Sequence, residues 1–182
     1  MGLIEWAQAT AGEHLAPLGR RWAHSEGVAG RAERLKALVG GDDRDALVAA
    51  AYLHDVGYAP ELVATGFHPI DGARHLRTLG QQRLASLIAY HGAALEEAEL
   101  RDLASELAEF SEEHSLVADI LTYCDLTTSP DGTRVTPGER LDEVVRRYGP
   151  DDVVARAVLE AHDRLMRTVE RVEARLLQIG VD

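Results

Sequence analysis

The chain has 182 residues, of which 46% are hydrophobic and 27% are charged, a composition that excludes a disordered protein. A chain of this length buries roughly 70% of the surface that its unfolded state exposes, so it needs neither a disulfide nor a metal merely to fold. Its 31 acidic and 19 basic residues give a net charge of −12, which argues against wholesale binding of nucleic acid or anionic lipid. A small anionic substrate remains compatible with this charge if a cation is held locally.

Cysteine content and apolar runs bear on the compartment. Cys124 is the only cysteine, so the chain can form no internal disulfide and offers no cysteine-based zinc site. The first residues lack a basic stretch followed by a long apolar one, so we expect no signal peptide. The longest apolar run, Ala46 to Leu53, is too short to span a bilayer. We therefore expect a cytoplasmic protein, one domain over residues 1–182, with neither a membrane nor a nucleic-acid duplex as partner.

Hydrophobic periodicity is helical along the chain, and no segment shows the sustained alternation of a strand. The pattern predicts a compact all-α bundle of about eight helices. In chain order the helical segments are 3–19, 22–39, 42–56, 68–80, 82–91, 95–110, 112–126, 137–149 and 151–179, with a loop over 60–67.

Several residues mark the expected helix ends. Ser111 is expected to cap the helix over 112–126, and Thr136 with Glu139 forms a capping-box pattern. Pro69 and Pro137 each stand at a first-turn position, where proline is tolerated.

Polar residues interrupt the apolar faces of four of these helices. His24, His54, His91 and Asp125 each fall on an apolar stripe at helical spacing, and Asp55 follows His54 at the last turn of its helix. Burying so many ionisable groups without partners costs several kcal/mol each, whereas a metal ion pairs the carboxylates and uses neutral imidazole nitrogen. Each residue alone has an ordinary explanation, as a hydrogen-bonded core histidine or a helix cap. Jointly, that explanation requires five coincidences on separate helices.

The ordered set of His24, the pair His54-Asp55, and Asp125 resembles the H…HD…D pattern of the HD-domain superfamily of metal-dependent phosphohydrolases. The surrounding residues are similar as well: Arg-Trp-Ala-His-Ser around the first histidine, Leu-His-Asp-Val-Gly around the pair, and Thr-Tyr-Cys-Asp at the last aspartate. The matched motifs cover roughly residues 20–128. The resemblance implies an HD-type helical bundle, with the helices over 137–179 packed on it.

Two further segments resemble those that follow the HD pair in the binuclear branches, namely His-Pro-Ile-Asp-Gly-Ala from His68 and Ala-Tyr-His-Gly around His91. The chain departs from some branches at Tyr58, where they carry lysine, and the Gly-Tyr-Pro signature of the cyclic-dinucleotide phosphodiesterases is absent. The resemblance implies one or two divalent transition-metal ions, from among Fe, Mn, Zn, Co and Ni. The implied ligands are His24, His54, Asp55 and Asp125 for one ion, and His68 and His91 for a second, with Asp55 bridging.

Phosphate requires further hydrogen-bond donors. Arg21 precedes His24 by three residues, so both share one helical face, and its planar fork suits a phosphate. Arg134 and Arg140 follow Asp125 through a glycine-containing loop and could fold over the site. We therefore expect Arg21, Arg134 and Arg140 to bind substrate, and Asp55 and Arg21 to act in catalysis.

These observations predict a phosphohydrolase that acts on a nucleotide or related small phosphoester through a metal-activated water or hydroxide. The alternative is a nucleotide-binding or regulatory HD protein with little catalytic turnover. A purely structural helical scaffold does not explain the inward polar residues. The type of phosphoester bond, the natural substrate, the metal and the oligomeric state stay open at this point.

Overall fold

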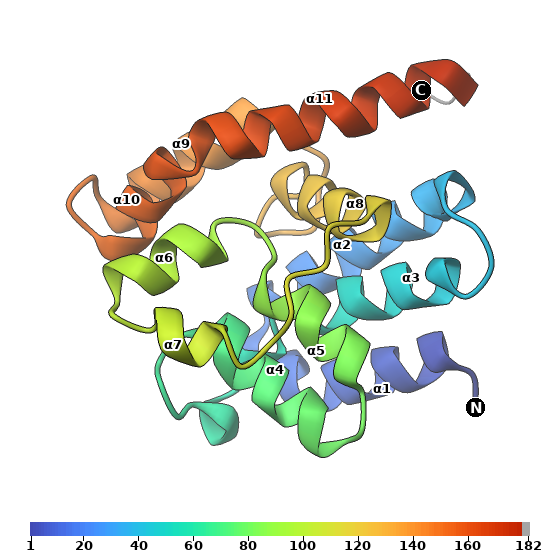
Figure 1. Ribbon diagram of the computed structural model, residues 1–182, viewed down its shortest axis with the longest axis horizontal. Helices are drawn as coiled ribbons and strands as arrows, with labels where there is room; N and C mark the ends of the chain where they lie inside the picture. The colour runs from blue at the N-terminus through green and yellow to red at the C-terminus, as the bar shows by residue number, and fades with distance from the viewer. Residues whose placement is uncertain (180–182) are drawn as a thin grey trace.

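The computed structural model describes residues 1–179, and within that range it contains eleven α-helices, four short 3₁₀ helices and no β-strand (Figure 1). The all-α class is therefore confirmed, with more helices than the expected eight. The helices are α1 (Leu3–Leu15), α2 (Arg20–Leu35), α3 (Asp43–Leu53), α4 (His68–Thr78), α5 (Gln82–Ala89), α6 (Ala94–Leu100), α7 (Ala104–Leu107), α8 (Leu116–Leu126), α9 (Pro137–Tyr148), α10 (Val153–Glu160) and α11 (His162–Ile179). The 3₁₀ helices are Ala16–Leu18, Lys36–Leu38, Val56–Tyr58 and Pro60–Leu62. No helix in the described range is long and apolar enough to cross a membrane.

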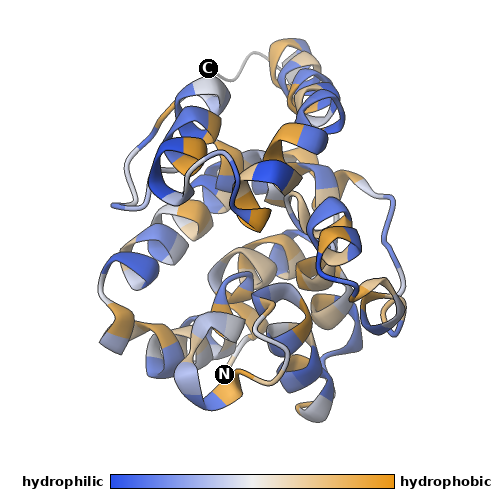
Figure 2. Cartoon of the chain, turned by 90° about the vertical axis from the view of Figure 1, so that its left-hand side faces the viewer, coloured by the Kyte–Doolittle hydropathy of each residue, from blue (hydrophilic) through white to orange (hydrophobic). Residues whose placement is uncertain are grey.

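Helix α3 forms the centre of the bundle, where it packs against α1, α2, α5 and α8. All six residues from 46 to 51, Ala-Leu-Val-Ala-Ala-Ala, are buried. A helix that is apolar on every side is stable only when neighbours cover it, and its alanines let those neighbours approach closely. The outer helices alternate hydrophilic and hydrophobic residues along their length, as amphipathic helices do (Figure 2). The last turn of α3 thus delivers His54 and Asp55 into the interior of the protein.

The three C-terminal helices lie against one side of this bundle. Helix α10 packs on α6 and α9, and the long helix α11 packs on α8. In Figure 1 these helices occupy the upper part of the molecule, in orange and red. They therefore lie over α6 and α8, and α8 carries Asp125, the last of the predicted ligands.

Several predicted helices end earlier than their periodicity suggests; the one expected over 82–91, for example, ends at Ala89, so His91 lies just beyond it. The first helix was expected to reach Gly19, but it ends at Leu15, because Pro17 has no N–H to continue the hydrogen-bond ladder. The expected helix over 95–110 is divided into α6 and α7 at Asp102, which has a positive φ of 58°. Aspartate tolerates this left-handed conformation better than most residues, and the conformation stops a right-handed helix.

The expected caps are partly confirmed. Helix α4 begins at His68-Pro69, and the Thr136–Glu139 capping box is present, with the Glu139 N–H donating to Thr136 Oγ1 at 3.2 Å. The expectation for Ser111 is wrong, because the helix begins at Leu116 and Ser115 caps it by accepting from the Ala118 N–H. The long segment 151–179 contains α10 and α11, separated only by Ala161.

Candidate metal centre

Three buried histidines are held in the same way, each by a hydrogen bond from Nδ1 to a backbone carbonyl oxygen. His54 Nδ1 donates to Ala51 at 2.8 Å, and His91 Nδ1 donates to Ile88 at 2.5 Å. His24 Nδ1 donates to the carbonyl of Ser129 at 3.0 Å. Because a carbonyl oxygen only accepts, these bonds place the proton on Nδ1 and leave the lone pair on Nε2 of every ring. A backbone carbonyl on the far nitrogen is the usual support of a metal-binding histidine.

The Nε2 atoms of His24 and His91 lie close to other groups that can hold a metal. His24 Nε2 lies 3.0 Å from Asp125 Oδ1, so a lone pair faces a carboxylate. His91 Nε2 lies 3.4 Å from His68 Nε2. His54 Nε2 is buried and has no hydrogen-bond partner among the described residues. A buried nitrogen without a partner costs free energy, and a cation placed among these atoms would satisfy all of them.

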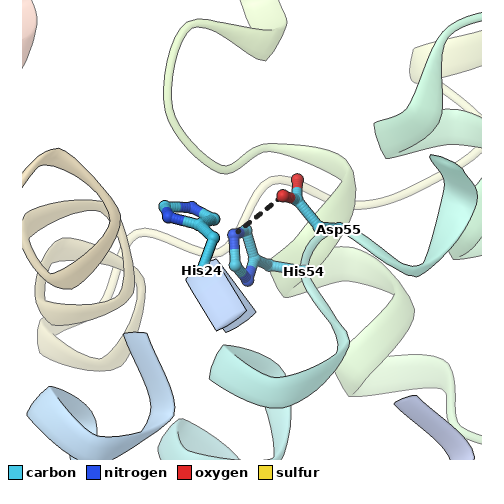
Figure 3. Close-up of side chains that lie close together, drawn as sticks. All are labelled: His24, His54 and Asp55. Atoms are coloured by element: carbon cyan, nitrogen blue, oxygen red, sulfur yellow. Dashed lines mark ion pairs between the residues drawn. The ribbon is translucent and has the colours of Figure 1, made fainter. Parts of the chain in front are cut away.

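Asp55 joins the two halves of this cluster. Its Oδ2 accepts from Arg21 Nη1 at 2.8 Å and lies 3.7 Å from His54 Nε2, while its Oδ1 lies 3.4 Å from His68 Nε2. Figure 3 shows the His24 and His54 rings beside the Asp55 carboxylate, with the His54–Asp55 pair dashed. The carboxylate therefore reaches both the His24–His54 side and the His68–His91 side.

Glycine at position 57 explains how His68 comes so close to Asp55. A Cβ on Gly57 would lie 2.1 Å from the carbonyl oxygen of His68 and 2.5 Å from the backbone nitrogen of Gly72. The 3₁₀ turn that follows the HD pair therefore packs directly on the backbone of α4. Any larger residue would push the start of α4, and His68 with it, away from the centre.

The ligand atoms form three groups, and within each group the atoms lie within 4.8 Å of one another. Together the groups contain all six predicted ligands. His54, Asp55 and His91 each belong to two of the groups, and the bridging position of Asp55 stays a prediction. The groups are His24, His54 and Asp55; His54, His91 and Asp125; and Asp55, His68 and His91.

The electrostatics favour the protonation states that a divalent cation requires. Burial lowers the pKa of His54 to about 4 and lowers the pKa of His68 well below its ordinary value, so both rings are neutral at pH 7. Burial alone would raise the pKa of Asp55, but Arg21 and the nearby imidazoles hold it well below its usual range. Burial alone would raise the pKa of Asp125 as well, but the neighbouring His24 and Arg140 side chains outweigh it and lower that pKa. Neutral imidazoles beside ionised carboxylates are the ligand state that binds a metal.

The three predicted phosphate-binding arginines are not all near the cluster. Arg21 contacts Asp55, and Arg140 of α9 lies with its Nη2 3.7 Å from Asp125 Oδ1. Both side chains line the cavity of about 100 Å³ over the cluster. The structure does not bring Arg134 there. Its backbone pairs with Thr128, and its side chain lines a separate cavity next to Arg31.

Three other residues of the site were not predicted as functional. Tyr58 is sandwiched between the Arg21 guanidinium, 3.7 Å from its ring centre, and the His68 ring, stacked at 4.0 Å. Arg147 also lines the cavity, and it falls seven residues after Arg140, a spacing that places both on one face of α9. Glu97 is buried in the wall of the same cavity, and nothing in its sequence context, apart from the helical pattern, indicates a role there. The spacing of Arg147 could have revealed it, whereas the stack around Tyr58 depends on the tertiary fold.

A larger cavity of about 840 Å³ lies between α5, α8 and α11, and the only candidate ligand that lines it is His91. The chemistry described above therefore belongs to the smaller cavity.

The family model of the HD domain matches residues 21–129, which contain all six ligands of the cluster. The chain belongs to the HD domain family. Proteins of the HD superfamily are generally metal-dependent phosphohydrolases, and the cluster of six candidate ligands could hold such a metal. Among curated proteins and among solved structures, none matches this chain.

Proposed function

We propose that this HD protein is a metal-dependent phosphohydrolase that acts on a nucleotide or a related small phosphoester. The observation that carries the proposal is the arrangement of three imidazoles, His24, His54 and His91, whose protonated nitrogens are all bound to carbonyls while their lone pairs converge on two carboxylates. A structural cluster would satisfy His54 Nε2 with a donor, and none of the described residues supplies one.

The residues of the chain have distinct roles in this proposal. His24, His54, Asp55 and Asp125 hold one divalent ion, and His68 and His91, with Asp55, hold a second. Such an ion, whether Fe, Mn, Zn, Co or Ni, activates water at neutral pH and polarises a phosphoryl oxygen.

Arg21 and Arg140 donate their N–H groups to the remaining phosphoryl oxygens, where charge develops during the reaction. Arg21 is already oriented by its 2.8 Å bond to Asp55. Arg134, which lines another cavity, has no place in this proposal. A cytoplasmic location stays a prediction.

The volume over the cluster bears equally on this function and on the alternative, a nucleotide-binding or regulatory protein with little turnover. The cavity over the cluster has a volume of about 100 Å³, below the 300–1,000 Å³ typical of small-molecule sites. A phosphoryl group fits in that volume, but a whole nucleotide does not.

Metal analysis followed by a substrate panel separates the two functions. Protein purified without chelator is analysed for metal, loaded with Mn, Fe, Co, Ni or Zn, and offered phosphomonoesters, phosphodiesters and nucleotides. We expect bound metal and turnover of at least one class, and loss of both in Asp125→Asn. The matched control is Asp163→Asn, since Asp163 has an 87% exposed side chain on α11. Metal and nucleotide binding without turnover would support the regulatory function, and no metal under any loading condition would contradict both.

A further inference from the structure

The cavity of about 100 Å³ over the ligand cluster is here called the inner cavity. A second cavity, of about 380 Å³, adjoins it on the side of α9. The two cavities are adjacent, because they have five lining residues in common: Arg21, His24, Tyr58, Arg140 and Arg147. The second cavity, which we call the outer pocket, is also lined by three residues that do not line the inner cavity: Leu18, Arg20 and Pro130. Its volume falls in the range of small-molecule sites, whereas that of the inner cavity does not.

The charge of the outer pocket is opposite to that of the whole protein. Four arginines line it, and none of the described residues in its lining is acidic. The chain as a whole carries 31 acidic and 19 basic residues. A concave surface of four guanidinium groups on so acidic a protein selects a ligand of high negative charge density, since the rest of the surface repels anions.

The arginines of the outer pocket have partners that an anionic ligand can replace or share. Arg140 and Arg147 both bind Glu143, so one carboxylate serves two cations. Arg20 binds Asp131 through an ion pair whose side chains are 69% and 63% exposed, and such exposed pairs are weak. Phosphate accepts from a guanidinium in the same bidentate geometry as a carboxylate, with more charge.

Most of the outer pocket lies outside the segment that matches the HD family. That match covers residues 21–129, whereas Arg20 precedes it and Arg140 and Arg147 follow it. The outer pocket is therefore built largely by parts of this chain that the family pattern does not describe.

We propose that the outer pocket binds a second phosphoryl group, so that the substrate carries at least two linked phosphoryl groups, as a nucleoside diphosphate or a longer phosphate chain does. The inference rests on the proposed function, because it assumes that the reacting phosphoryl group occupies the inner cavity. The inner cavity has room for that group alone, and the next group in the chain then falls between Arg20 and Arg147. Leu18 and Pro130 supply the apolar wall for the remainder of the molecule.

The test compares two non-hydrolysable probes on the full-length, metal-loaded protein by calorimetry. Methylphosphonate carries one phosphonate group and methylenediphosphonate carries two. The variant is Arg20→Ala/Arg147→Ala, and the matched control is Arg156→Ala/Arg175→Ala, which removes the same charge from α10 and α11 outside the outer pocket. Circular dichroism checks that each variant is folded.

We expect the wild-type protein to bind methylenediphosphonate at least about tenfold more tightly than methylphosphonate, since two more charge-assisted hydrogen bonds form. The pocket variant should lose about tenfold for the diphosphonate and less than about twofold for the monophosphonate, whereas the control should change neither. The proposal would be overturned if the pocket variant lost the same affinity for both probes. It would also be overturned if the pocket variant bound the diphosphonate as tightly as the control variant does.

Hydrolysis is measured separately on the same preparations, so that the two proposals can fail independently. Diphosphonate selectivity that disappears in the pocket variant, without turnover of any phosphoester, would support the outer pocket as an anion site and overturn the phosphohydrolase function. Turnover in which the pocket variant keeps the wild-type preference for one or two phosphoryl groups would support the phosphohydrolase function and overturn the outer pocket as a second phosphoryl site.

Discussion

The helices before residue 129 and those after residue 137 contribute to the site in different ways. In the first region three ligand histidines are buried and fixed by backbone carbonyls, as His54 is by the Ala51 carbonyl. In the second the functional side chains are arginines on one face of α9, held by other side chains such as Glu143. Rigid ligands suit the placement of an ion, since small displacements are costly there. Arginines held by exchangeable ion pairs suit contact with a ligand that comes and goes.

This comparison predicts that the first region determines whether chemistry occurs and the second determines which molecule undergoes it. The predictions below test that division from the largest expected effect to the smallest.

Removing a carboxylate ligand should have the largest effect. Asp55→Asn and Asp125→Asn should each lose metal and lower kcat/KM on the order of 10³-fold, because several kcal/mol of charge stabilisation depend on the ion. Elemental analysis and steady-state kinetics measure both quantities, with Asp163→Asn as the control. Full metal content and full activity in either variant would show that the carboxylates are not ligands.

The two histidines outside the H…HD…D set should affect one ion only. We expect two metal equivalents in the loaded protein, and His68→Ala and His91→Ala should each retain one. Turnover should fall about 10²-fold, as expected when a two-ion clamp becomes a single ion. One equivalent in the wild-type protein, unchanged in both variants, would indicate a mononuclear site.

Arg140 tests whether the C-terminal region takes part in catalysis. Arg140→Ala removes a charge-assisted donor and should lower kcat/KM about 10- to 100-fold with metal content unchanged. Arg156→Ala on the neighbouring helix should be close to wild type. A loss of metal in Arg140→Ala would mean that α9 supports the ligands themselves, and the division between the regions would then be wrong.

Tyr58 sharpens the comparison, because it lies within the first region but contacts both a ligand and an arginine. We expect Tyr58→Leu to weaken binding of the second ion up to about tenfold, since ring stacking is worth about 0.5–1.5 kcal/mol. Tyr58→Phe keeps the ring and should restore the affinity. Titration with Mn²⁺ measures it, and equal behaviour of the two variants would exclude a positioning role for the ring.

Chelation should change the helical content least. The hydrophobic core consists mainly of aliphatic residues that pack on one another, so far-UV circular dichroism should stay strongly helical after metal removal. The melting temperature should fall, because a ligand that binds only the folded state stabilises it by mass action. A collapse to coil would show that the metal is required for folding.

Three of the candidate ligands could be predicted from spacing alone, because each lies within a helix or directly after one whose apolar face is visible in the sequence. His24, His91 and Asp125 follow that rule, and helical geometry alone turns them inward. The arginines do not follow it. Arg134 was expected near the site because it follows Asp125 in the chain, but the bridge between Thr128 and Arg134 leads it into another cavity.

Another difference arises from tertiary packing, which a local pattern does not contain. Arg147 reaches the site only because α9 packs across α8, and nothing within α9 specifies that contact. The end of α6 and the start of α8 differ from expectation for local reasons. A single left-handed residue, Asp102, and a serine four positions later than expected set those boundaries.

The carbonyl bonds of the histidines have a consequence for protein design. His54 and His91 each lie just beyond the end of a helix and donate to a carbonyl of its last turn three residues earlier, Ala51 in α3 and Ile88 in α5. A segment of four residues therefore carries the orientation of its own imidazole wherever that helix end is placed. Such a segment is a portable unit, and transplanting it to the end of a helix in an unrelated bundle should transfer a ready-oriented ligand without its original neighbours.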